Sequence, residues 1–504
     1  MKKRLFLGWF LLMGLLVSAR GAESTVRALS LQDCIQAALE HNLDLRIERY
    51  NPQLSLFDLN AVYAGYDPQF SIEGQHDYSK AGRSIFQGGL EAPGSETDTD
   101  SFRSSLGGLL PFGTRYTLQG SASDQYGQSF FLDTNLVVQP RSFENSRASA
   151  SINLTQPLLK DFWIDATRLN IRLGKSRLEQ SEHGLRSQIM SVINEVEQAY
   201  YDLIYARESV KVQEKALELA TRLLQENKRR VEVGAMAPLD EKQAEAQAAS
   251  SRADLLQAQN ALSLAENALK RLMSDDFATM TRMVLIPSGT LDASRQLFNL
   301  HDSWGKGLTQ RPDYLQAKLT VEQYGIRLKY DHNQLFPQLE VFGGYGLGGT
   351  GNEFSDAFGE VRNRTQPFHY YGGRLVIPLA NTGARNRYKS TKAQQEQTVL
   401  QLKKLEQEIM IQIDNAIKVA QSNFERVEAT RAARQFAEAA LDAEQKKLES
   451  GKSTSFFVLQ LQRDLTSASS EEIRALTVYK KSLAQLAFLE GSTLERNAVS
   501  VAAR

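Results

Sequence analysis

Apolar positions recur at three- and four-residue steps along two very long stretches of this chain that contain no proline. The first stretch runs from about Arg168 to Val233, and Leu178, Val192 and Leu203 lie on its apolar stripe. This spacing is the period of an amphipathic helix with one buried face. Roughly 65 residues at about 1.5 Å each would form a rod on the order of 100 Å long, whereas helices of globular domains average about 11–12 residues.

Each long helix is followed by a turn and a returning helix. Gly234 supplies a helix stop and Pro238 fits the first turn of the next helix, which predicts a helical hairpin over residues 164–273. The same pattern returns in the second half and reverses at Gly451, which predicts a second hairpin over residues 380–490. Because a coiled coil would produce the same pattern, the hairpins alone do not decide the architecture.

Outside the hairpins the hydrophobic pattern changes to period two. After Pro68, one face of residues 70–78 is apolar or aromatic, while the other face carries polar side chains such as Glu73. Strands of about 10 residues with one polar and one apolar face are typical of a membrane barrel whose interior holds water. The predicted strands cover residues 70–80, 101–110, 114–125 and 147–156 in the first half and residues 338–348 and 368–377 in the second.

The two halves of the chain repeat the same order of elements. Laid on each other without a gap, Asp44 falls on Asp313 and Pro68 falls on Pro337, which is the signal of an internal duplication. Ser30 is the predicted N-cap of the first helix. The predicted first repeat, 22–296, holds helices at 30–66, four strands and the hairpin 164–273, and the second repeat, 297–504, holds helices at 297–335, two strands, the hairpin 380–490 and a C-terminal tail.

Six strands are too few to close a barrel with an aqueous interior, because about eight strands leave room only for side chains. An open sheet edge cannot face lipid, since each unpaired N–H and C=O group there would cost several kcal/mol. We therefore predict a mixed α and β membrane protein whose copies contribute strands to a shared transmembrane β-barrel. Residues 80–99 and 126–146 are predicted as long polar loops on one side of the membrane, and Pro111–Thr114 as a short turn on the other side.

The N-terminus and the composition indicate an exported protein. Residues 1–21 have a basic start, an apolar middle and small residues at the predicted cleavage point, which is the pattern of a secretory signal peptide. Its removal takes away four of the 59 basic residues, which leaves 55 against 59 acidic residues and a formal charge of −4. This charge does not suggest a nucleic acid partner. Cys34, the only cysteine, lies on an apolar helical face, so that we predict a buried thiol.

The sequence offers no catalytic, cofactor-binding or metal-binding site. Gly344, Gly346 and Gly349 match a dinucleotide-loop pattern, but they end a predicted strand and enter a polar loop instead of a helix. The six histidines are scattered, and none is paired with a second ligand cluster at metal-binding spacing. We therefore predict that the protein is not an enzyme and needs no cofactor.

Several segments, taken in order, resemble the TolC family of outer-membrane efflux and secretion channels over essentially the whole mature chain. The resemblance implies a homotrimer with one barrel in the outer membrane of a Gram-negative bacterium and a tapering helical tunnel in the periplasm. The matching segments are LSLQDCIQAALEHNLDL (29–45), DPQF (67–70), LTQPLL (154–159), VGAMAPLDEKQAEAQ (233–247), FPQL (336–339) and SGKSTSFFVLQLQRDL (450–465).

One segment departs from the family pattern. Members of the family usually contribute four strands per chain, and residues Phe102–Asp124 would add two more here. We therefore predict an enlarged shared barrel. The alternative is that the extra hairpin folds outside the barrel or plugs its lumen.

In this family the hairpin turns dock a periplasmic adaptor, a membrane fusion protein that connects the channel to an inner-membrane transporter. Both turn glycines also act as helix C-caps. The positions that correspond to the docking turns are Gly234, Ala235 and Met236 in the first hairpin and Gly451, Lys452 and Ser453 in the second.

The closed end of the tunnel is lined in the family by acidic side chains of the second hairpin. This chain has Phe457 and Gln460 there, and Asp240 matches an aspartate that helps to hold the closed state. The constriction would then be less acidic than usual, which favours a gate that closes by dewetting. The alternative is that Phe456 and Phe457 simply pack the hairpin.

The resemblance implies a passive exit duct of a tripartite efflux pump or a type I secretion system. A stand-alone outer-membrane porin is one alternative, although a porin has no use for such long helices. A periplasmic coiled-coil adaptor is the other, although it should lack the alternating strands. The sequence does not identify the transported substrate.

Overall fold

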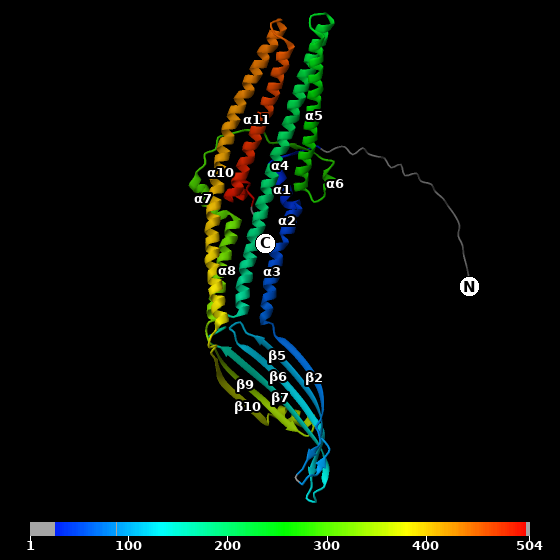
Figure 1. Ribbon diagram of the computed structural model, residues 1–504, viewed down its shortest axis with the longest axis vertical. Helices are drawn as coiled ribbons and strands as arrows, with labels where there is room; N and C mark the ends of the chain where they lie inside the picture. Colours follow the sequence, from blue (N-terminus) through cyan, green and yellow to red (C-terminus); the bar gives the residue numbers. More distant parts are fainter. Residues whose placement is uncertain (1–25, 87, 500–504) are drawn as a thin grey trace, which may run out of the picture. The chain divides into compact units, whose positions relative to one another are not determined.

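The structure is a computed structural model that describes residues 26–86 and 88–499 (Figure 1). The predicted signal peptide, residues 1–21, lies outside the described residues. The chain divides into two compact units. Among the described residues, unit 1 holds residues 26–46, Gln188–Gly307 and residues 412–499, and unit 2 holds Ile47–Ser187 and Leu308–Ile411. The helices α4 (Ala166–Glu232) and α10 (Thr382–Glu449) contribute residues to both units.

No helix among the described residues is both long enough and apolar enough to cross a membrane.

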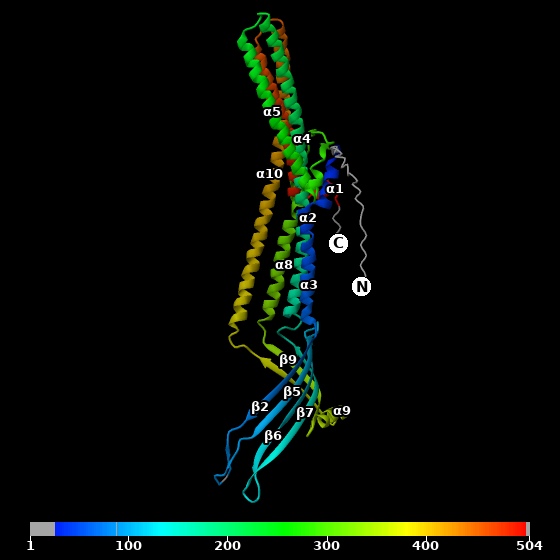
Figure 2. The same ribbon diagram turned by 90° about the vertical axis from the view of Figure 1, so that its right-hand side faces the viewer.

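Unit 2 is built on one six-stranded sheet with the order β10-β9-β7-β6-β5-β2. Every neighbouring pair is antiparallel, and the strands run side by side in Figure 2. Strands β2 and β10 form the two edges of this sheet. The strands are β2 (Gln69–Lys80), β5 (Glu96–Leu109), β6 (Arg115–Leu132), β7 (Val138–Pro157), β9 (Gln338–Gly351) and β10 (Gln366–Val376).

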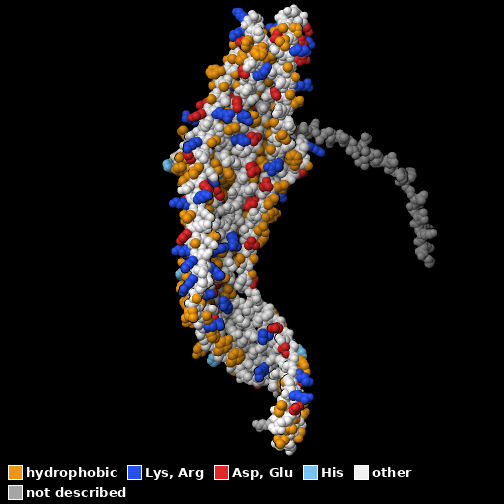
Figure 3. Space-filling view, in the orientation of Figure 1, with side chains coloured by type: hydrophobic (Ala, Val, Ile, Leu, Met, Phe, Trp, Pro, Cys, Tyr) orange, Lys and Arg blue, Asp and Glu red, His pale blue; other side chains and the backbone are white. Residues whose placement is uncertain are grey.

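The register of the sheet separates an apolar face from a polar face, because successive side chains point to opposite sides of a strand. On the side of the sheet drawn in Figure 3, most of the surface is white, which is the colour of the backbone and of side chains that are neither hydrophobic nor charged. One row of the apolar face consists of Phe70, Leu106, Leu118, Ile152 and Tyr345. The next row, on the polar face, consists of Ser71, Ser105, Gln119, Ser151 and Gly346.

The long loop predicted over residues 126–146 is wrong. Strands β6 and β7 continue through it and stay paired as far as Leu132 with Val138. Asp133 closes the short turn, since its Oδ1 accepts from the backbone N–H groups of Asn135 at 2.7 Å and Val137 at 3.1 Å. These strand ends escaped prediction because polar residues occupy both of their faces, which removes the alternation that marks a strand.

The predicted loop over residues 80–99 is shorter than expected as well. Strand β5 already begins at Glu96, where it pairs with Lys80 at the end of β2. The remainder contains a small hairpin of β3 (Ser84–Ile85) and β4 (Glu91–Ala92).

The segment Phe102–Asp124, which we predicted to add two strands, folds into the middle of the sheet. It forms most of β5 and β6, which pair with each other and lie between β2 and β7. The turn between them is closed by the backbone N–H of Leu110, which donates to Thr114 O at 2.8 Å. This hairpin is therefore an integral part of the sheet and not a plug.

A helix that was not predicted covers part of the apolar face. Helix α9 (Phe354–Asn363) packs against β7 and β9, and Ala122 and Ala148 are buried on this face. A Cβ at Gly349 would lie 2.1 Å from the backbone O of Ala357, so that only glycine lets the helix come this close to the strand. The prediction of a polar loop after Gly349 is therefore wrong.

The glycine pattern of β9 is explained by packing. Gly344, Gly346 and Gly349 all belong to β9, which is paired on both sides. A Cβ at Gly346 would lie 2.3 Å from the ring of Phe368 on the neighbouring strand β10. These glycines make room for neighbouring side chains and backbone, and they do not form a loop that could hold a phosphate.

The helical part of unit 2 contains α3 (Tyr50–Val62), the 3₁₀ turn η1 (Tyr63–Tyr66), α8 (Pro312–Asn333) and the adjoining turns of α4 and α10. Gln180 Nε2 donates to Gln316 O at 3.1 Å, and Gln316 Nε2 donates to Gln180 O at 2.9 Å, which joins α4 to α8. Tyr314 OH donates to Glu406 Oε1 at 2.6 Å and joins α8 to α10. Burial and this bond raise the pKa of Tyr314 to about 12.

The larger part of unit 1 consists of the ends of α4 and α10 with the returning helices. Its N-terminal helix confirms the predicted cap, because Ser30 Oγ accepts from Asp33 N–H at 3.2 Å. Cys34 is fully buried, as predicted. The helices that begin or lie within unit 1 are α1 (Leu31–His41), α2 (Leu43–Glu48), α5 (Pro238–Met273), α6 (Phe277–Met280), α7 (Leu300–Gln310), α11 (Ser455–Glu490) and α12 (Thr493–Arg496).

Two short parallel strands of unit 1 were not predicted. Strand β1 (Val26–Leu29) pairs with β8 (Val284–Pro287). An extended segment follows β8 and crosses α10 and α11, where Tyr479 OH donates to Ser294 O at 2.6 Å. The predicted helix start at Leu297 is wrong, because the side chain of Asn299 accepts from His301 N–H at 3.1 Å and the helix begins after it.

Candidate functional site

The turn of the first hairpin is closed by a Schellman motif. Gly234 has a φ of 76° and donates its N–H to Val231 O at 2.9 Å, and Ala235 N–H donates to Arg230 O at 2.8 Å. Glycine adopts this left-handed conformation without the steric cost that a Cβ would add. Pro238 then starts α5, as the sequence predicts.

The second hairpin ends in the same way. Gly451 has a φ of 72° and donates its N–H to Leu448 O at 3.1 Å, and Lys452 N–H donates to Lys447 O at 2.9 Å. Gly234, Ala235, Gly451 and Lys452 are all exposed. Met236 and Ser453 are half-buried, so four of the six predicted docking positions lie on the exposed surface of two turns of matching geometry.

Apolar packing near the turns joins the two hairpins. Leu223 of α4 belongs to one buried cluster with Leu441 and Leu448 of α10 and with Val458 and Leu459 of α11. The sequence does not reveal this pairing, because the long apolar stripes do not specify which helices face each other.

Asp240 forms one of the polar contacts between the two hairpins. Its Oδ1 accepts from Ser455 Oγ at 3.0 Å, and Ser455 is fully buried. Its backbone O accepts from the buried Asn227 Nδ2 at 3.3 Å. Asp240 thus lies where the start of α5 meets the start of α11. Ser455 and Asn227 were not among the predicted site residues.

A second polar contact orders the turn of the second hairpin. The hydroxyl of Ser453 donates to Glu444, and Lys447 Nζ donates to Glu444 Oε2 at 3.1 Å. The bond from Ser453 and, after it, the bond and charge of Lys447 hold the pKa of Glu444 below its ordinary value. Ser453, predicted as a docking residue, therefore also holds the turn in place.

The predicted constriction residues of α11 do not meet Asp240. Phe457 is 55% exposed and Gln460 is exposed as well. The rings of Phe456 and Phe457 lie 5.7 Å apart in an edge-to-face arrangement. Phe456 is 49% exposed, so that neither ring fills the interior of the hairpin of this chain. This exposure disfavours the alternative in which both rings only pack their own hairpin.

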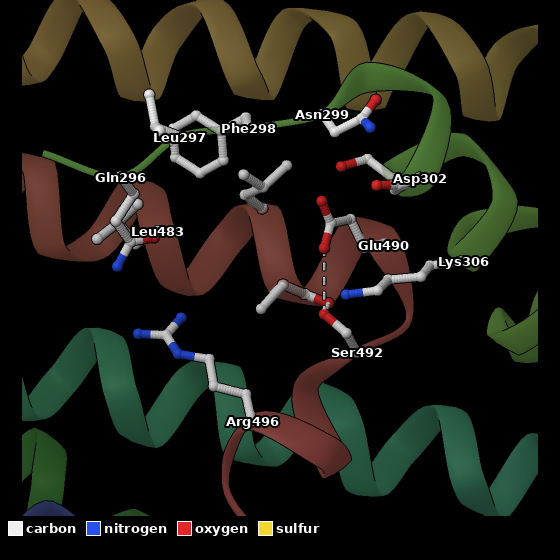
Figure 4. A pocket seen from close by; sticks show the side chains of 13 residues that line it. Gln296, Leu297, Phe298, Asn299, Asp302, Lys306, Leu483, Glu490, Ser492 and Arg496 are labelled. Carbon is white, nitrogen blue, oxygen red and sulfur yellow. Dashed lines mark hydrogen bonds between the residues drawn. The ribbon is translucent and has the colours of Figure 1, made fainter.

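Unit 1 also contains a cavity of about 330 Å³ between α7, α11 and α12 (Figure 4). Its lining carries charges of both signs, namely Asp302 and Lys306 of α7, Glu490 of α11 and Arg496 of α12. Ser492 Oγ donates to Glu490 Oε2 at 3.3 Å. None of the predicted site residues lines this cavity.

The sequence model of the family described as "Outer membrane efflux protein" matches residues 34–274 and 305–492, which is most of the chain. The first matched segment contains α4 and α5, and the second contains α10 and α11.

The chain belongs to the outer membrane efflux protein family.

Individual relatives agree with this assignment. The outer membrane protein TolC of Vibrio cholerae is 24% identical to this chain over 242 residues, which cover 48% of this chain and 52% of that protein. The match therefore spans about half the length of this relative. As a TolC-family protein, the chain is a protein of the outer membrane.

Solved structures of outer membrane proteins share the fold. The outer membrane protein VceC of Vibrio cholerae has a TM-score of 0.65 at 17% identity, over 92% of this chain and 96% of that chain. The open state of the MtrE channel of Neisseria gonorrhoeae has a TM-score of 0.63 at 17% identity, over 94% of this chain and 91% of that chain. At these identities the similarity establishes the fold alone.

Proposed function

We propose that this outer membrane efflux protein is the exit duct of a tripartite efflux pump or a type I secretion system. Three copies would form one barrel in the outer membrane of a Gram-negative bacterium, with the helices in the periplasm. The duct would conduct substrates passively from an inner-membrane transporter, which an adaptor connects to it. The observation that carries the proposal is a six-stranded sheet with two open edges and with one polar and one apolar face.

The direction of the edge strands supports closure by identical copies. All neighbours in the sheet are antiparallel, so that β2 and β10, the first and the sixth strand across it, run in opposite directions. When β10 of one copy lies beside β2 of the next, the new pair is also antiparallel. Three copies of the six-stranded sheet would give eighteen strands, and barrels of about 16–18 strands enclose an aqueous channel.

The two faces of the sheet support the same arrangement. The apolar face would meet lipid, and the serine- and glutamine-rich face would line the water-filled interior. Trp163, which follows β7, is 55% exposed and stacks on Arg168 at 4.8 Å. An exposed aromatic ring beside a cation is typical of a membrane interface.

The two hairpin turns are the proposed adaptor-docking surface. Gly234, Ala235 and Met236 in the first turn and Gly451, Lys452 and Ser453 in the second would contact the adaptor. Their matching geometry supports this role, because one adaptor surface could then recognise both turns.

The proposed constriction combines Asp240, Phe457 and Gln460. Asp240 would hold the hairpins together through Ser455, while Phe457 and Gln460 would face the tunnel from α11. Replacing acidic side chains by an aromatic ring lowers the attraction for cations at a narrow point. A Phe457→Asp variant should therefore raise the ratio of cation to anion permeability in planar bilayers. An unchanged ratio would contradict the proposed place of Phe457.

Assembly is tested on the full chain purified from outer membranes. We expect a trimer that requires detergent and that forms conducting pores in planar bilayers. A water-soluble monomer that stays dispersed without detergent would refute the proposal.

The stand-alone porin is the second candidate, and adaptor contact separates it from the duct. Cysteines at Ala235 or Lys452 should crosslink to an adaptor encoded by the same organism. Deletion of the gene should raise the susceptibility of the cells to substrates of the matching transporter. A porin would form pores without either effect.

A further inference from the structure

The charged side chains of the six-stranded sheet are divided unequally between its two faces. The register that places Ser71 and Gln119 on the polar face places every arginine of these strands there as well. These are Arg103, Arg115, Arg141, Arg147 and Arg374. The polar face has fewer carboxylates, namely Glu73, Asp77 and Glu340. The other carboxylates of these strands lie on the apolar face, and they are Glu96, Asp98, Asp100, Asp124 and Glu144.

Two carboxylates of the polar face are already paired with arginines. Glu340 is buried and lies between Arg374, whose Nη2 is 2.7 Å from Oε2, and Arg115, whose Nη1 is 3.8 Å from Oε1. Arg103 Nη1 lies 3.7 Å from Glu73 Oε2. Since Glu340 serves two arginines, this face keeps an excess of positive charge even where its ion pairs form.

Arg147 has no counter-charge beside it. It is exposed on β7, a strand in the interior of the sheet, and pairs with Ser123 of β6 on one side and with Thr350 of β9 on the other. Its neighbours along the strand on the same face are Asn145 and Ser149, which are uncharged as well. Within residues 26–86 and 88–499 its guanidinium group makes no hydrogen bond or ion pair. The charge therefore faces the water of the polar face directly.

We propose that three copies of Arg147 form a ring that attracts anions inside the shared barrel, so that the duct suits substrates that carry negative charge. This inference rests on the proposed function, because the polar face must line the lumen of a trimer. Rings of arginine or lysine side chains are a common basis of anion selectivity in pores. The wall of an eighteen-stranded barrel lies about 18 Å from its axis. The ring therefore acts through its electric field and does not form a binding site.

The salt concentration sets the reach of this field. The Debye length is about 8 Å at 0.15 M ionic strength and about 30 Å at 0.01 M. Anions are therefore enriched near the wall at the higher salt concentration and across the whole lumen at the lower one. The carboxylates of the apolar face lie on the other side of the sheet, so that their field acts mainly on the outer surface of the barrel.

A cysteine at Ser123 reports the potential in the lumen, because Ser123 lies directly opposite Arg147 on the same face. The full-length Ser123→Cys trimer is reconstituted in lipid vesicles and treated with two thiosulfonate reagents of similar size. The sulfonatoethyl reagent is anionic, and the trimethylammonioethyl reagent is cationic. The ratio of their reaction rates, divided by the same ratio for free cysteine, cancels the reactivity of the thiol and leaves the effect of charge. Cys34 is fully buried and does not compete.

Arg147→Gln in this background removes one positive charge about 8 Å from the thiol. The ratio of the anionic to the cationic rate should fall about fourfold at 0.01 M ionic strength and about twofold at 0.15 M. Arg147→Lys is the matched control, because it keeps the charge and should keep the ratio. An unchanged ratio in Arg147→Gln, or an equal fall in Arg147→Lys, would overturn the anion-attracting ring. The side chain is exposed, so that both variants should fold.

A cysteine at Ala150 separates this inference from the proposed function. Ala150 lies on β7 two residues from Ile152 and therefore on the apolar face. In vesicles it should be covered by lipid and resist both reagents, while the cysteine at Ser123 reacts. Equal reaction at both positions would overturn the proposed placement of the two faces. A reactive cysteine at Ser123 alone, with a ratio that does not depend on Arg147, would overturn only the ring.

Discussion

The hydroxyl of Ser455 is the smallest group whose removal should loosen the two hairpins from each other. It donates to Asp240 Oδ1 at 3.0 Å, and the side chain is fully buried. The substitution Ser455→Ala removes this donor and leaves the surrounding packing almost unchanged, because alanine occupies nearly the same space. The carboxylate of Asp240 would then accept a hydrogen bond from water in place of the Ser455 hydroxyl.

The expected cost follows from the exposure of the acceptor. A hydrogen bond to a charged group contributes about 1.5–3 kcal/mol to stability when it is well shielded from water. Asp240 is partly exposed, so that solvent replaces much of the lost bond and we expect about 1 kcal/mol. This free energy should change the ratio of separated to joined hairpins about fivefold.

Spin labels at Ala235 and Lys452 measure the distance between the two turns, since both positions are exposed. In the Ser455→Ala variant the distance distribution should broaden toward larger values, and the conductance of bilayer pores should rise. Ser470→Ala is the control, because the Ser470 hydroxyl donates to Thr466 O of its own helix at 2.9 Å. If both variants give the same distances and conductance, the contact with Asp240 does not hold the hairpins together.

Three further predictions concern single residues. Gly451→Ala should destabilise its turn by about 1–2 kcal/mol, because a Cβ is unfavourable at a φ of 72°; hydrogen exchange near the turn should accelerate, whereas helical Gly383→Ala should not accelerate it. The contact made by Tyr314 should stabilise the protein fully below pH 10 and be lost as the pH rises through about 12, its raised pKa; thermal melts of Tyr314→Phe should lack this alkaline step. The pKa of Glu444 is lowered, so that its contribution to the stability of the second turn is present above pH 4.5 and is lost only at lower pH. The protection of the amides of this turn against hydrogen exchange, relative to unfolded peptide at the same pH, should therefore fall below pH 4.5 in the wild type and stay constant in Glu444→Gln.

The long helices could be predicted from the sequence because their period repeats over many turns. The first hairpin was predicted over residues 164–273, and in the structure α4 and α5 run from Ala166 to Met273. The turns could be predicted too, because glycine and proline act through local backbone conformation. The start at Ala166 reflects one local contact, in which Asp165 Oδ1 accepts from Arg168 N–H at 2.9 Å.

Elements that depend on distant contacts could not be predicted. Strand β1 has four residues and forms only because β8 lies beside it, more than 250 residues later in the chain. Helix α9 is short, and in the sequence the glycines of β9 that make room for it match a dinucleotide-loop pattern instead. Ser455 is one serine among many, and only its contact with Asp240 across the two hairpins distinguishes it.

The matched lengths of the two hairpins constrain how this chain can change. Helices α4 and α10 have 67 and 68 residues, and α5 and α11 have 36 each. Each residue added to one arm would advance its turn by about 1.5 Å and rotate it by about 100°. Such a change in a single hairpin would separate Asp240 from Ser455 and place the two turns at unequal heights. The two hairpins are therefore expected to gain or lose helical turns together.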